Sequence, residues 1–254
     1  MEKETLFIAI SSQKGGVGKS VLTTLLSSYL YFNLNKNVAI VDCDYPQYSI
    51  FNMREDDRKT VRQSPELQAA IVRQFEVYSK KAYPVIKAGP DKALEEVYKL
   101  VDRSETVPDI IFFDLPGTVN NTGIINLILN MNYIFIPIIA DRRVLQSSLA
   151  FVMTIREYMK AFAGKINLEG IYMFWNKVDK REHTELYSYF NSILQEEQIP
   201  ILCTELPDTK KYNKELSLYR DSVFRSTLFP PDKKLLRNSN LEQLITEICQ
   251  IIKL

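Results

Sequence analysis

The sequence predicts an α/β protein in which a doubly wound, mostly parallel sheet of about seven strands lies between two layers of helices. Short runs of consecutive apolar residues, such as Leu6–Ile10 and Ile110–Phe113, are typical of strands buried on both faces of a parallel sheet. Between these runs, apolar residues recur at helical spacing. We expect one domain over residues 1–254, because this length supports a sizeable core and no repeat or long linker divides it.

The first predicted strand leads into a glycine-rich turn, Lys14-Gly15-Gly16-Val17-Gly18-Lys19-Ser20. A helix follows, with apolar residues at helical spacing: Leu22, Leu25, Leu26, Tyr29 and Leu30. This order of strand, turn and helix is the plan of a phosphate-binding P-loop, whose glycines let backbone N–H groups wrap around an anion. Lys19 is then expected to reach the β- and γ-phosphates, and the Ser20 hydroxyl to bind Mg²⁺.

Acidic residues follow the second strand, Val38–Val41, in the run Asp42-Cys43-Asp44, at the sheet edge where doubly wound sheets bind ligands. The next segment, residues 52–64, is polar and of mixed charge, which predicts an exposed loop. A helix is predicted from Pro65 to Lys81, with one apolar stripe made by Leu67, Ala70, Ile71, Phe75 and Tyr78. A strand over residues 83–86 and a helix over residues 91–101 follow.

The strand Asp109–Asp114 delivers a second acid beside the P-loop, and Leu115-Pro116-Gly117 comes directly after it. This arrangement predicts a Walker B acid and a glycine-hinged switch. Asp114 is expected to hold Mg²⁺ through water, and the Gly117 backbone to sense a γ-phosphate.

The second half of the chain repeats the alternation of strands and helices. Strands are predicted over residues 132–139, 168–175 and 199–204, and helices over residues 142–162, 180–195 and 241–252. The last helix has Glu242 and Glu247 on its polar face, whereas lysine and arginine dominate that face in helices that dock on anionic membranes. We therefore expect it to pack on the sheet.

Composition excludes several classes of protein. The net charge of +1 provides no overall field for nucleic acid, so any such role needs a local basic patch. Three scattered cysteines fit neither a metal-binding spacing nor a disulfide framework, and no apolar run approaches the roughly 20 residues of a membrane span. A reducing, cytoplasmic location is expected.

The turn at residues 14–20 resembles the deviant Walker A loop, K-G-G-x-G-K-[ST], of the ParA/MinD ATPases, a branch of the SIMIBI class of P-loop NTPases. The usual pattern G-x-x-x-x-G-K-[ST] would place a glycine where this chain has Gln13. The resemblance implies that Lys14 reaches across a two-fold axis to the nucleotide of a partner subunit. It also implies that Asp44, in a D-x-D-P-Q motif interrupted by Tyr45, orients the attacking water or holds Mg²⁺.

The tetrapeptide Asn176-Lys177-Val178-Asp179 follows the strand over residues 168–175 and leaves undecided whether the base of the nucleotide is adenine or guanine. It is similar to the N-K-x-D motif of GTPases, whose aspartate accepts hydrogen bonds from guanine, and residues 114–117 fit the D-x-x-G of that class. In the ParA/MinD branch the asparagine alone is often kept and contacts adenine. Lys14 favours the ATPase, and a polar strand end with no contact to the base is a third interpretation of Lys177 and Asp179.

By this resemblance the chain is a slow, partner-stimulated, Mg²⁺-dependent ATPase switch with ATP and Mg²⁺ as cofactors. The expected catalytic residues are Lys14, Lys19 and Asp44, and the expected metal ligands are Ser20, Asp44 and Asp114. The expected nucleotide-binding residues are Lys14, Gly15, Gly16, Val17, Gly18, Lys19, Ser20, Val21, Gly117, Asn176, Pro207 and Asp208, the last two lying against the base.

The resemblance also implies a nucleotide-dependent homodimer, a small ParB-like stimulating partner, and a role in segregating or positioning a plasmid, a mobile element or a complex. Non-specific DNA is a candidate partner because eight basic residues lie between Lys210 and Arg237 against three acidic ones. A solvated basic face is the alternative interpretation. A SIMIBI-type GTPase and a MinD-type membrane-associated ATPase are alternatives for the whole chain. A reductase or metal-insertion relative is disfavoured because it needs cysteine ligands.

Overall fold

The computed structural model describes residues 5–117, 122–179, 181, 185–219 and 222–254, and its centre is a six-stranded sheet. The strand order is β3-β2-β4-β1-β5-β6, and every paired strand is parallel to its neighbour. The strands are β1 (Leu6–Ile10), β2 (Val38–Asp42), β3 (Val85–Lys87), β4 (Ile110–Asp114), β5 (Tyr133–Ile138) and β6 (Gly170–Trp175). The doubly wound α/β fold class predicted from the sequence is confirmed.

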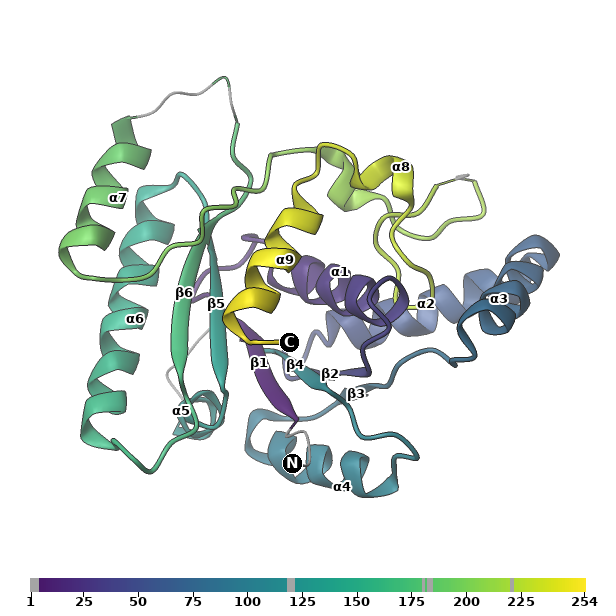
Figure 1. Ribbon diagram of the computed structural model, residues 1–254, viewed down its shortest axis with the longest axis horizontal. Coiled ribbons are helices and arrows are strands. Elements are labelled where there is room, and N and C mark those ends of the chain that lie inside the picture. The colour runs from purple at the N-terminus through teal and green to yellow at the C-terminus, as the bar shows by residue number, and fades with distance from the viewer. Residues whose placement is uncertain (1–4, 118–121, 180, 182–184, 220–221) are drawn as a thin grey trace.

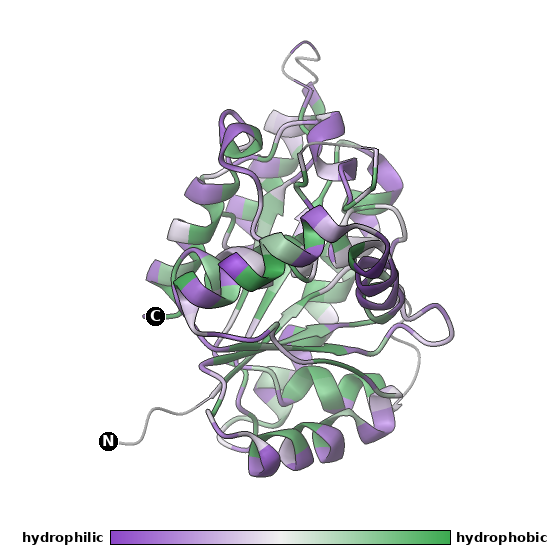
Figure 2. Ribbon diagram, turned by 90° about the vertical axis from the view of Figure 1, so that its right-hand side faces the viewer, coloured by the Kyte–Doolittle hydropathy of each residue, from purple (hydrophilic) through white to green (hydrophobic). Residues whose placement is uncertain are grey.

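Helices cover both faces of this sheet, as Figures 1 and 2 show. Alternate residues of one strand point to opposite faces, so Ile8 and Ile10 of β1 pack in one apolar cluster and Ala9 in the other. One cluster contains residues of α1 (Lys19–Phe32) and α9 (Leu241–Ile251). The other contains residues of α4 (Ala93–Arg103), α5 (Thr122–Leu129), α6 (Arg142–Ala161) and α7 (Glu185–Glu196). Burial on two faces is why the strands are apolar throughout.

The predicted seventh strand at residues 199–204 is reduced to one parallel bridge, between Met173 and Ile201. The backbone N–H groups of Cys203 and Thr204 donate to the Glu247 carboxylate of α9, at 2.7 and 2.9 Å. The Thr204 amide, which would be the next donor to β6 after that of Leu202, is therefore not available to extend the ladder. Among the described residues the sheet therefore has six strands, and the prediction of a strand at residues 199–204 is wrong.

The prediction of an exposed loop over residues 52–64 is also wrong, because α2 (Ser49–Gln63) is a helix. Arg54 and Asp57 on its inner face are each only 3% exposed. The outer face carries the ion pairs Arg58–Glu55, at 2.7 Å, and Lys59–Asp56, at 2.9 Å. A helix whose buried face is polar has no apolar stripe, which is the signal used to recognise helices in a sequence.

Arg54 and Asp57 belong to a buried polar network that also contains Tyr83, Ser226 and Thr227. The Arg54 guanidinium donates to the carbonyl oxygens of Tyr83, at 2.8 Å, and Thr227, at 3.0 Å, and to the Thr227 hydroxyl, at 2.8 Å. One Asp57 oxygen accepts from the Thr227 amide, at 2.7 Å, and from the hydroxyls of Thr227 and Ser226, at 2.8 and 2.9 Å. The network fixes α2 against a segment far away in the sequence.

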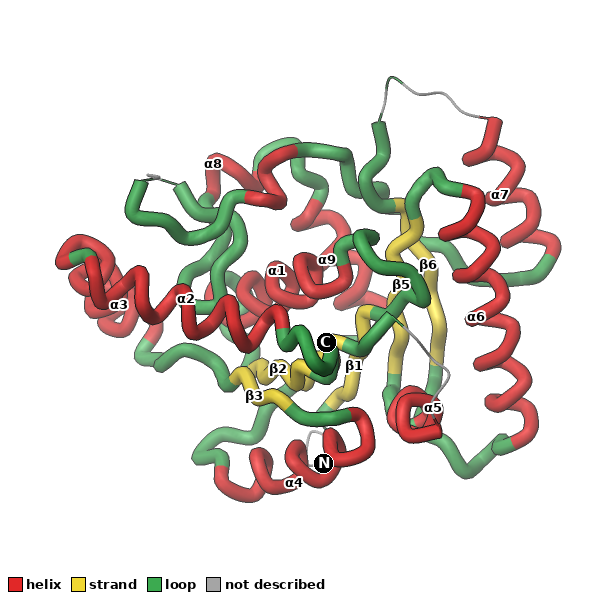
Figure 3. Tube along the Cα trace, turned by 180° about the vertical axis from the view of Figure 1, so that it is seen from behind, coloured by secondary structure: helices red, strands yellow, loops and turns green. Residues whose placement is uncertain are grey.

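The helix predicted from Pro65 to Lys81 is α3 (Pro65–Tyr78), and its apolar stripe is not buried. No residue of α3 is buried, and Phe75 is 50% exposed. Together α2 and α3 form an arm that extends beyond the sheet (Figures 1 and 3). Apolar residues at helical spacing predicted the helix correctly, although they do not indicate whether another element covers it.

The final helix, α9, packs on the body of the protein as predicted. Leu241, Leu244, Ile245 and Ile248 are buried. α9 lies beside α1 in Figures 1 and 3, where the Tyr29 hydroxyl donates to Glu242 at 2.8 Å. No helix of the described residues is long and apolar enough to cross a membrane.

Candidate functional site

The glycine-rich turn joins β1 to the amino end of α1, at the carboxyl edge of the sheet. Gly16 and Gly18 have φ angles of 78° and 95°, in the left-handed region that favours glycine. A Cβ atom on Gly18 would lie 2.9 Å from Asn176 Nδ2, so a larger residue would clash. No side chain caps the start of α1, which leaves its first N–H groups available to an anion.

The two lysines of this turn occupy different environments. Lys19 is 9% exposed, and its ammonium donates to the Lys14 carbonyl oxygen at 3.4 Å. A Cβ atom placed on Gly117 would lie 3.6 Å from the Lys19 Nζ atom, so residue 117 closes over this lysine. Lys14 itself is exposed. The sequence therefore places one cation inside the loop and one outside it.

Two acids end adjacent strands beneath the loop, since Asp42 of β2 and Asp114 of β4 are partners in the sheet register. Asp114 is fully buried, and neither carboxylate oxygen has a hydrogen-bond partner among the described residues. Burial raises the pKa of Asp114 to about 7, whereas the nearby Ser20 hydroxyl and Lys19 ammonium act in the opposite direction. A buried carboxyl group without partners requires an explanation, because leaving a polar group unpaired in the interior costs about 1–3 kcal/mol.

Asp42 has a role that the sequence analysis missed. Its carboxylate accepts from the N–H groups of Ile50 and Phe51, at 2.9 and 3.0 Å, and from that of Asp44, at 3.2 Å. It thus fixes both the Asp44 loop and the first turn of α2. Asp44 remains half-buried at the pocket; burial raises its pKa, and the Lys19 charge lowers it.

These acids fit a magnesium site. Mg²⁺ prefers oxygen ligands and is usually bound through one or two carboxylates together with phosphates and water. The described residues contain no group of three or more His, Cys, Asp or Glu side chains that would enclose a metal alone. The unpaired Asp114 carboxylate beside the Ser20 hydroxyl supplies oxygen donors of this kind, with Asp44 at the rim.

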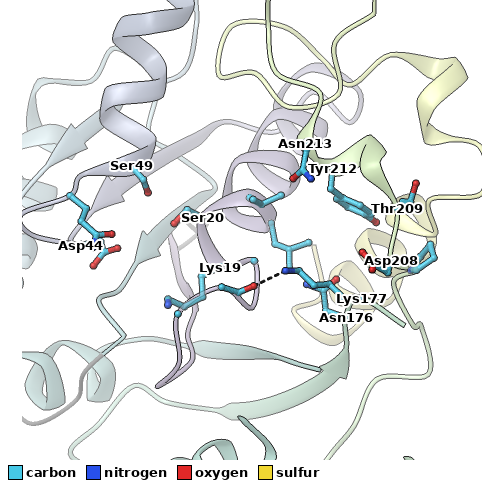
Figure 4. A pocket seen from close by; sticks show the side chains of 17 residues that line it. Lys19, Ser20, Asp44, Ser49, Asn176, Lys177, Asp208, Thr209, Tyr212 and Asn213 are labelled. Carbon is cyan, nitrogen blue, oxygen red and sulfur yellow. Dashed lines mark hydrogen bonds between the residues drawn. The ribbon is translucent and has the colours of Figure 1, made fainter. Parts of the chain in front are cut away.

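A pocket of about 410 Å³ opens above the turn (Figure 4). Of the predicted site residues, it is lined by Gly15, Gly16, Gly18, Lys19, Ser20, Val21, Asp44, Asn176, Pro207 and Asp208. Lys14, Val17, Gly117 and Asp114 do not line it. Lys177 of the N-K-x-D tetrapeptide also lines the pocket. The sequence analysis assigned no role to six further lining residues: Leu22, Gln47, Ser49, Thr209, Tyr212 and Asn213.

The far wall of the pocket comes from residues 207–213. The isolated parallel bridge between Val178 and Pro207 brings this segment beside the end of β6. The short 3-10 helix η2 (Lys210–Asn213) then turns Tyr212 and Asn213 toward the pocket (Figure 4). The Tyr212 hydroxyl donates to the Ser239 carbonyl oxygen at 2.7 Å, which fixes the ring. No motif marks these residues, so only their position in the fold identifies them.

The side chains of the N-K-x-D tetrapeptide point in two different directions. Asn176 Nδ2 donates to the Val17 carbonyl oxygen at 2.8 Å, and the Lys177 ammonium donates to that of Gly16 at 2.7 Å (Figure 4). Asp179 instead accepts from the Arg181 guanidinium, at 2.6 and 2.9 Å, and does not line the pocket. These hydrogen bonds lower the pKa of Asp179 to about 2.

Only some of the basic side chains at residues 210–237 are free to contact a phosphate backbone. Arg225 pairs with Glu215, the Lys211 ammonium donates to a backbone carbonyl oxygen, and Arg220 lies outside the described residues. Four of the eight basic side chains are exposed and have no ion pair among the described contacts: Lys210, Lys233, Lys234 and Arg237.

Comparison with known proteins gives the family. Residues 8–219 match the family model described as the CobQ/CobB/MinD/ParA nucleotide binding domain. A search of curated protein sequences gives no match.

Solved structures agree with this family in fold. A putative plasmid partition protein from Borrelia burgdorferi bound to AMPPNP is 16% identical, with a TM-score of 0.60 over 97% of this chain and 100% of that one. A McdA variant from Cyanothece in complex with ATP is 15% identical, with a TM-score of 0.60 over 98% and 97% of the two chains. The septum site-determining protein MinD from Pyrococcus horikoshii with Mg-ADP is 15% identical, with a TM-score of 0.59 over 98% and 96%.

The identities to these structures are low, so this likeness concerns the fold alone. The family model, in contrast, spans the P-loop, both strand-end acids and the segment that forms the far wall of the pocket. The resemblance of the glycine-rich turn to that of ParA and MinD proteins is thereby confirmed. The chain belongs to the CobQ/CobB/MinD/ParA family of nucleotide-binding domains.

Proposed function

We propose that this protein is a Mg²⁺-dependent ATPase switch of the ParA type, which dimerises around bound ATP and segregates or positions a plasmid, a mobile element or a complex. The observation that carries the proposal is the pocket over the P-loop, with the unpaired Asp114 carboxyl group beneath it and Lys14 exposed outside it. The relatives in complex with AMPPNP, ATP and Mg-ADP support a nucleotide as the ligand.

In this mechanism the P-loop amides and the Lys19 ammonium hold the triphosphate, and Ser20, Asp114 and Asp44 would hold Mg²⁺. Bound there, Mg²⁺ would supply positive charge that offsets the negative charge of the phosphates. Asp44 lies at the pocket rim and accepts a hydrogen bond from the attacking water, which orients it. Gly117 lies close to the Lys19 ammonium and is the proposed γ-phosphate sensor. ATP turnover without a partner is expected to be slow, because a switch requires its ATP-bound state to persist until a partner protein completes the site.

The orientation of Asn176 supports adenine as the base. The Val17 carbonyl oxygen only accepts hydrogen bonds, so the Asn176 amide must turn its NH₂ group toward it. The side-chain oxygen is left as an acceptor, which suits the 6-amino group of adenine and opposes the 6-oxo group of guanine. Asp179, which a GTPase would use to read guanine, is engaged by Arg181. The SIMIBI-type GTPase is therefore the less favoured alternative.

Variants of the two lysines test the proposal. Lys19→Ala should lose nucleotide binding, because the buried triphosphate loses its main cationic partner. Lys14→Ala should bind ATP yet fail to dimerise or to hydrolyse it, because its side chain lies outside its own pocket. Analytical ultracentrifugation with ATP, in an Asp44→Ala background that retains ATP, measures the dimer. Equal dimerisation with and without the Lys14 side chain would exclude the sandwich arrangement.

Non-specific DNA is the proposed surface for the ATP-bound dimer, and a small ParB-like protein is the proposed stimulator. The exposed Lys210, Lys233, Lys234 and Arg237 would be doubled by two-fold symmetry, so each half needs only weak phosphate contacts. Changing Lys233, Lys234 and Arg237 to glutamine should weaken binding to all duplex sequences alike and leave ATP affinity unchanged. If the ATP-trapped dimer has no affinity for duplex at low salt, the cargo is not DNA.

A membrane-associated role is disfavoured because the apolar face of α9 is used inside the protein. The proposed location is the cytoplasm. Flotation of the ATP-bound protein with anionic vesicles would contradict this part of the proposal.

A further inference from the structure

Two neighbouring side chains after β6 hold two neighbouring carbonyl groups of the P-loop. Lys177 binds the Gly16 carbonyl oxygen at 2.7 Å, and Asn176 binds that of Val17 at 2.8 Å. Both contacts join segments about 160 residues apart in the chain, and Figure 4 shows the lysine lying along the loop toward its carbonyl. Both contacts are made to the P-loop backbone, so neither is the contact with the base that the N-K-x-D resemblance predicts.

We propose that Lys177 is a positioning residue for the phosphate loop: its ammonium fixes the Gly16 peptide so that the loop presents its N–H groups to phosphate, whichever base the nucleotide carries. The inference rests on the proposed function only in taking nucleotide phosphate as the ligand of the loop.

The planarity of the peptide unit explains how a contact on a carbonyl oxygen positions an N–H group. The C=O of Gly16 and the N–H of Val17 belong to one rigid unit and point in opposite directions. Fixing the Gly16 oxygen toward Lys177 therefore fixes the Val17 N–H away from it. The Asn176 contact does the same for the N–H of Gly18. Two consecutive donors are thus oriented before any anion arrives.

The loop needs this support because its own backbone is unusually free. Gly16 and Gly18 both have positive φ values, and glycine adopts many alternative conformations at little steric cost. Nothing lies within 4 Å of a Cβ atom placed on Gly15 or Gly16, so packing does not restrain these peptides. A hydrogen bond from a charged donor is a suitable restraint where packing is absent.

The backbone of Lys177 is consistent with a retained functional role. Its φ of 53° lies in the left-handed region, which a residue with a Cβ atom rarely adopts. Two backbone bonds hold this conformation, from the Asn176 N–H to Ile138 at 2.7 Å and from the Val178 N–H to Leu206 at 2.9 Å. Glycine or asparagine would suit the backbone better, yet the position holds the residue whose ammonium reaches Gly16.

The first experiment examines the protein without nucleotide. The chain has eight glycines, so glycine-selective ¹⁵N labelling gives a small set of amide signals in an NMR spectrum. Lys177→Met removes the ammonium and keeps the stem, and should shift or broaden the signals of Gly16 and Gly18 while those of Gly89 and Gly164 stay in place. Lys177→Arg should restore them. Asp179→Ala, in the same segment but without a contact to the loop, is the matched control and should leave the loop glycines unchanged.

The second experiment measures affinity for ATP, ADP and GTP by calorimetry. Lys177→Met should weaken all three by a similar factor, of about three- to fivefold, because the hydrogen bond is exposed to solvent. A loss confined to one base would mean that Lys177 reads the base, and unchanged affinities together with unchanged glycine signals would mean that it positions nothing. Either result overturns the inference. If the wild-type protein binds no nucleotide, the proposed function fails, and the glycine spectrum alone decides the role of Lys177.

Lys177→Gly separates positioning from a merely structural role. Glycine relieves the left-handed backbone, so the thermal midpoint of the nucleotide-free protein should rise or stay constant. Affinity should still fall as it does in Lys177→Met. A variant that is more stable and binds nucleotide as tightly as the wild type would show that only the turn conformation matters.

Discussion

Arg54→Ala should be among the most destabilising single changes in α2, although this helix has the sequence of an exposed segment. The guanidinium makes three hydrogen bonds of 2.8–3.0 Å and is 3% exposed. Its removal leaves the carbonyl oxygens of Tyr83 and Thr227 unpaired in the interior and takes the cation away from the buried Asp57. Breaking a buried charge network by removing one partner costs about 3–5 kcal/mol.

The helix provides a matched control one turn later. Arg58 pairs with Glu55 at 2.7 Å, but these side chains are 50% and 41% exposed. Surface pairs of this kind contribute about 0–1 kcal/mol, so Arg58→Ala should leave the free energy of unfolding within about 0.5 kcal/mol of wild type. Urea unfolding at neutral pH, followed by circular dichroism, measures both variants.

Arg54→Lys extends the test to a milder change, because lysine keeps the charge but cannot reproduce the forked geometry. It should be destabilised by less than Arg54→Ala and by more than Arg58→Ala. The reasoning is refuted if Arg54→Ala loses under about 1 kcal/mol, or no more than its exposed neighbour. Asp57 would then not depend on the guanidinium, and the polar network would contribute little to stability.

Three further outcomes follow from the structure. Burial raises the pKa of Asp114 from 3.8 to about 7, so the folded state binds this proton more tightly than the unfolded state does. In unfolding measured with EDTA, the free energy of unfolding should therefore fall by up to about 4 kcal/mol as pH rises from about 4 to 7. Asp114→Asn should not show this fall. Asp179→Ala should leave ATP affinity within twofold in calorimetry, because its carboxylate faces Arg181 and does not line the pocket; preferential loss of GTP binding would contradict this. Leu244→Ala in α9 should cost about 2–5 kcal/mol in urea unfolding, whereas Val77→Ala on exposed α3 should change stability by under about 0.5 kcal/mol; similar values would mean that α9 is not docked in solution.

The sequence predicted the sheet well because burial on two faces leaves little freedom in composition. Ile110–Phe113 is apolar throughout because every residue of it is completely buried. α6 was predictable for a related reason, since its inner stripe is apolar and its outer face is polar. The failures share one cause, namely partners that lie far away in the chain. Arg54 is buried against Tyr83 and Thr227, and the Thr204 amide of the predicted strand at residues 199–204 binds Glu247 instead of β6.

The candidate site also contains residues that the sequence predicts and residues that it does not. The P-loop, Asp114 and Asn176 follow directly from strands, so their position at one sheet edge could be predicted, while their roles remain predictions. Thr209, Tyr212 and Asn213 could not be found, because the Val178–Pro207 bridge that places them leaves no periodic pattern in the sequence. Asp42 was assigned no role, because a strand-end acid that binds backbone amides has the same sequence signature as one that binds a ligand.

The three strand-end carboxyl groups also determine what can enter the pocket. Asp42 and Asp44 each raise the pKa of Asp114, because a third negative charge beneath the loop is unfavourable. A triphosphate without a counterion would add several more negative charges at the same place, with Lys19 as the buried cation of the loop. A divalent cation that entered with the nucleotide would offset this charge. For the ATPase proposed above, occupancy should then follow the concentration of the magnesium–ATP complex rather than that of total ATP, and the proposed switch would respond to the magnesium supply of the cell.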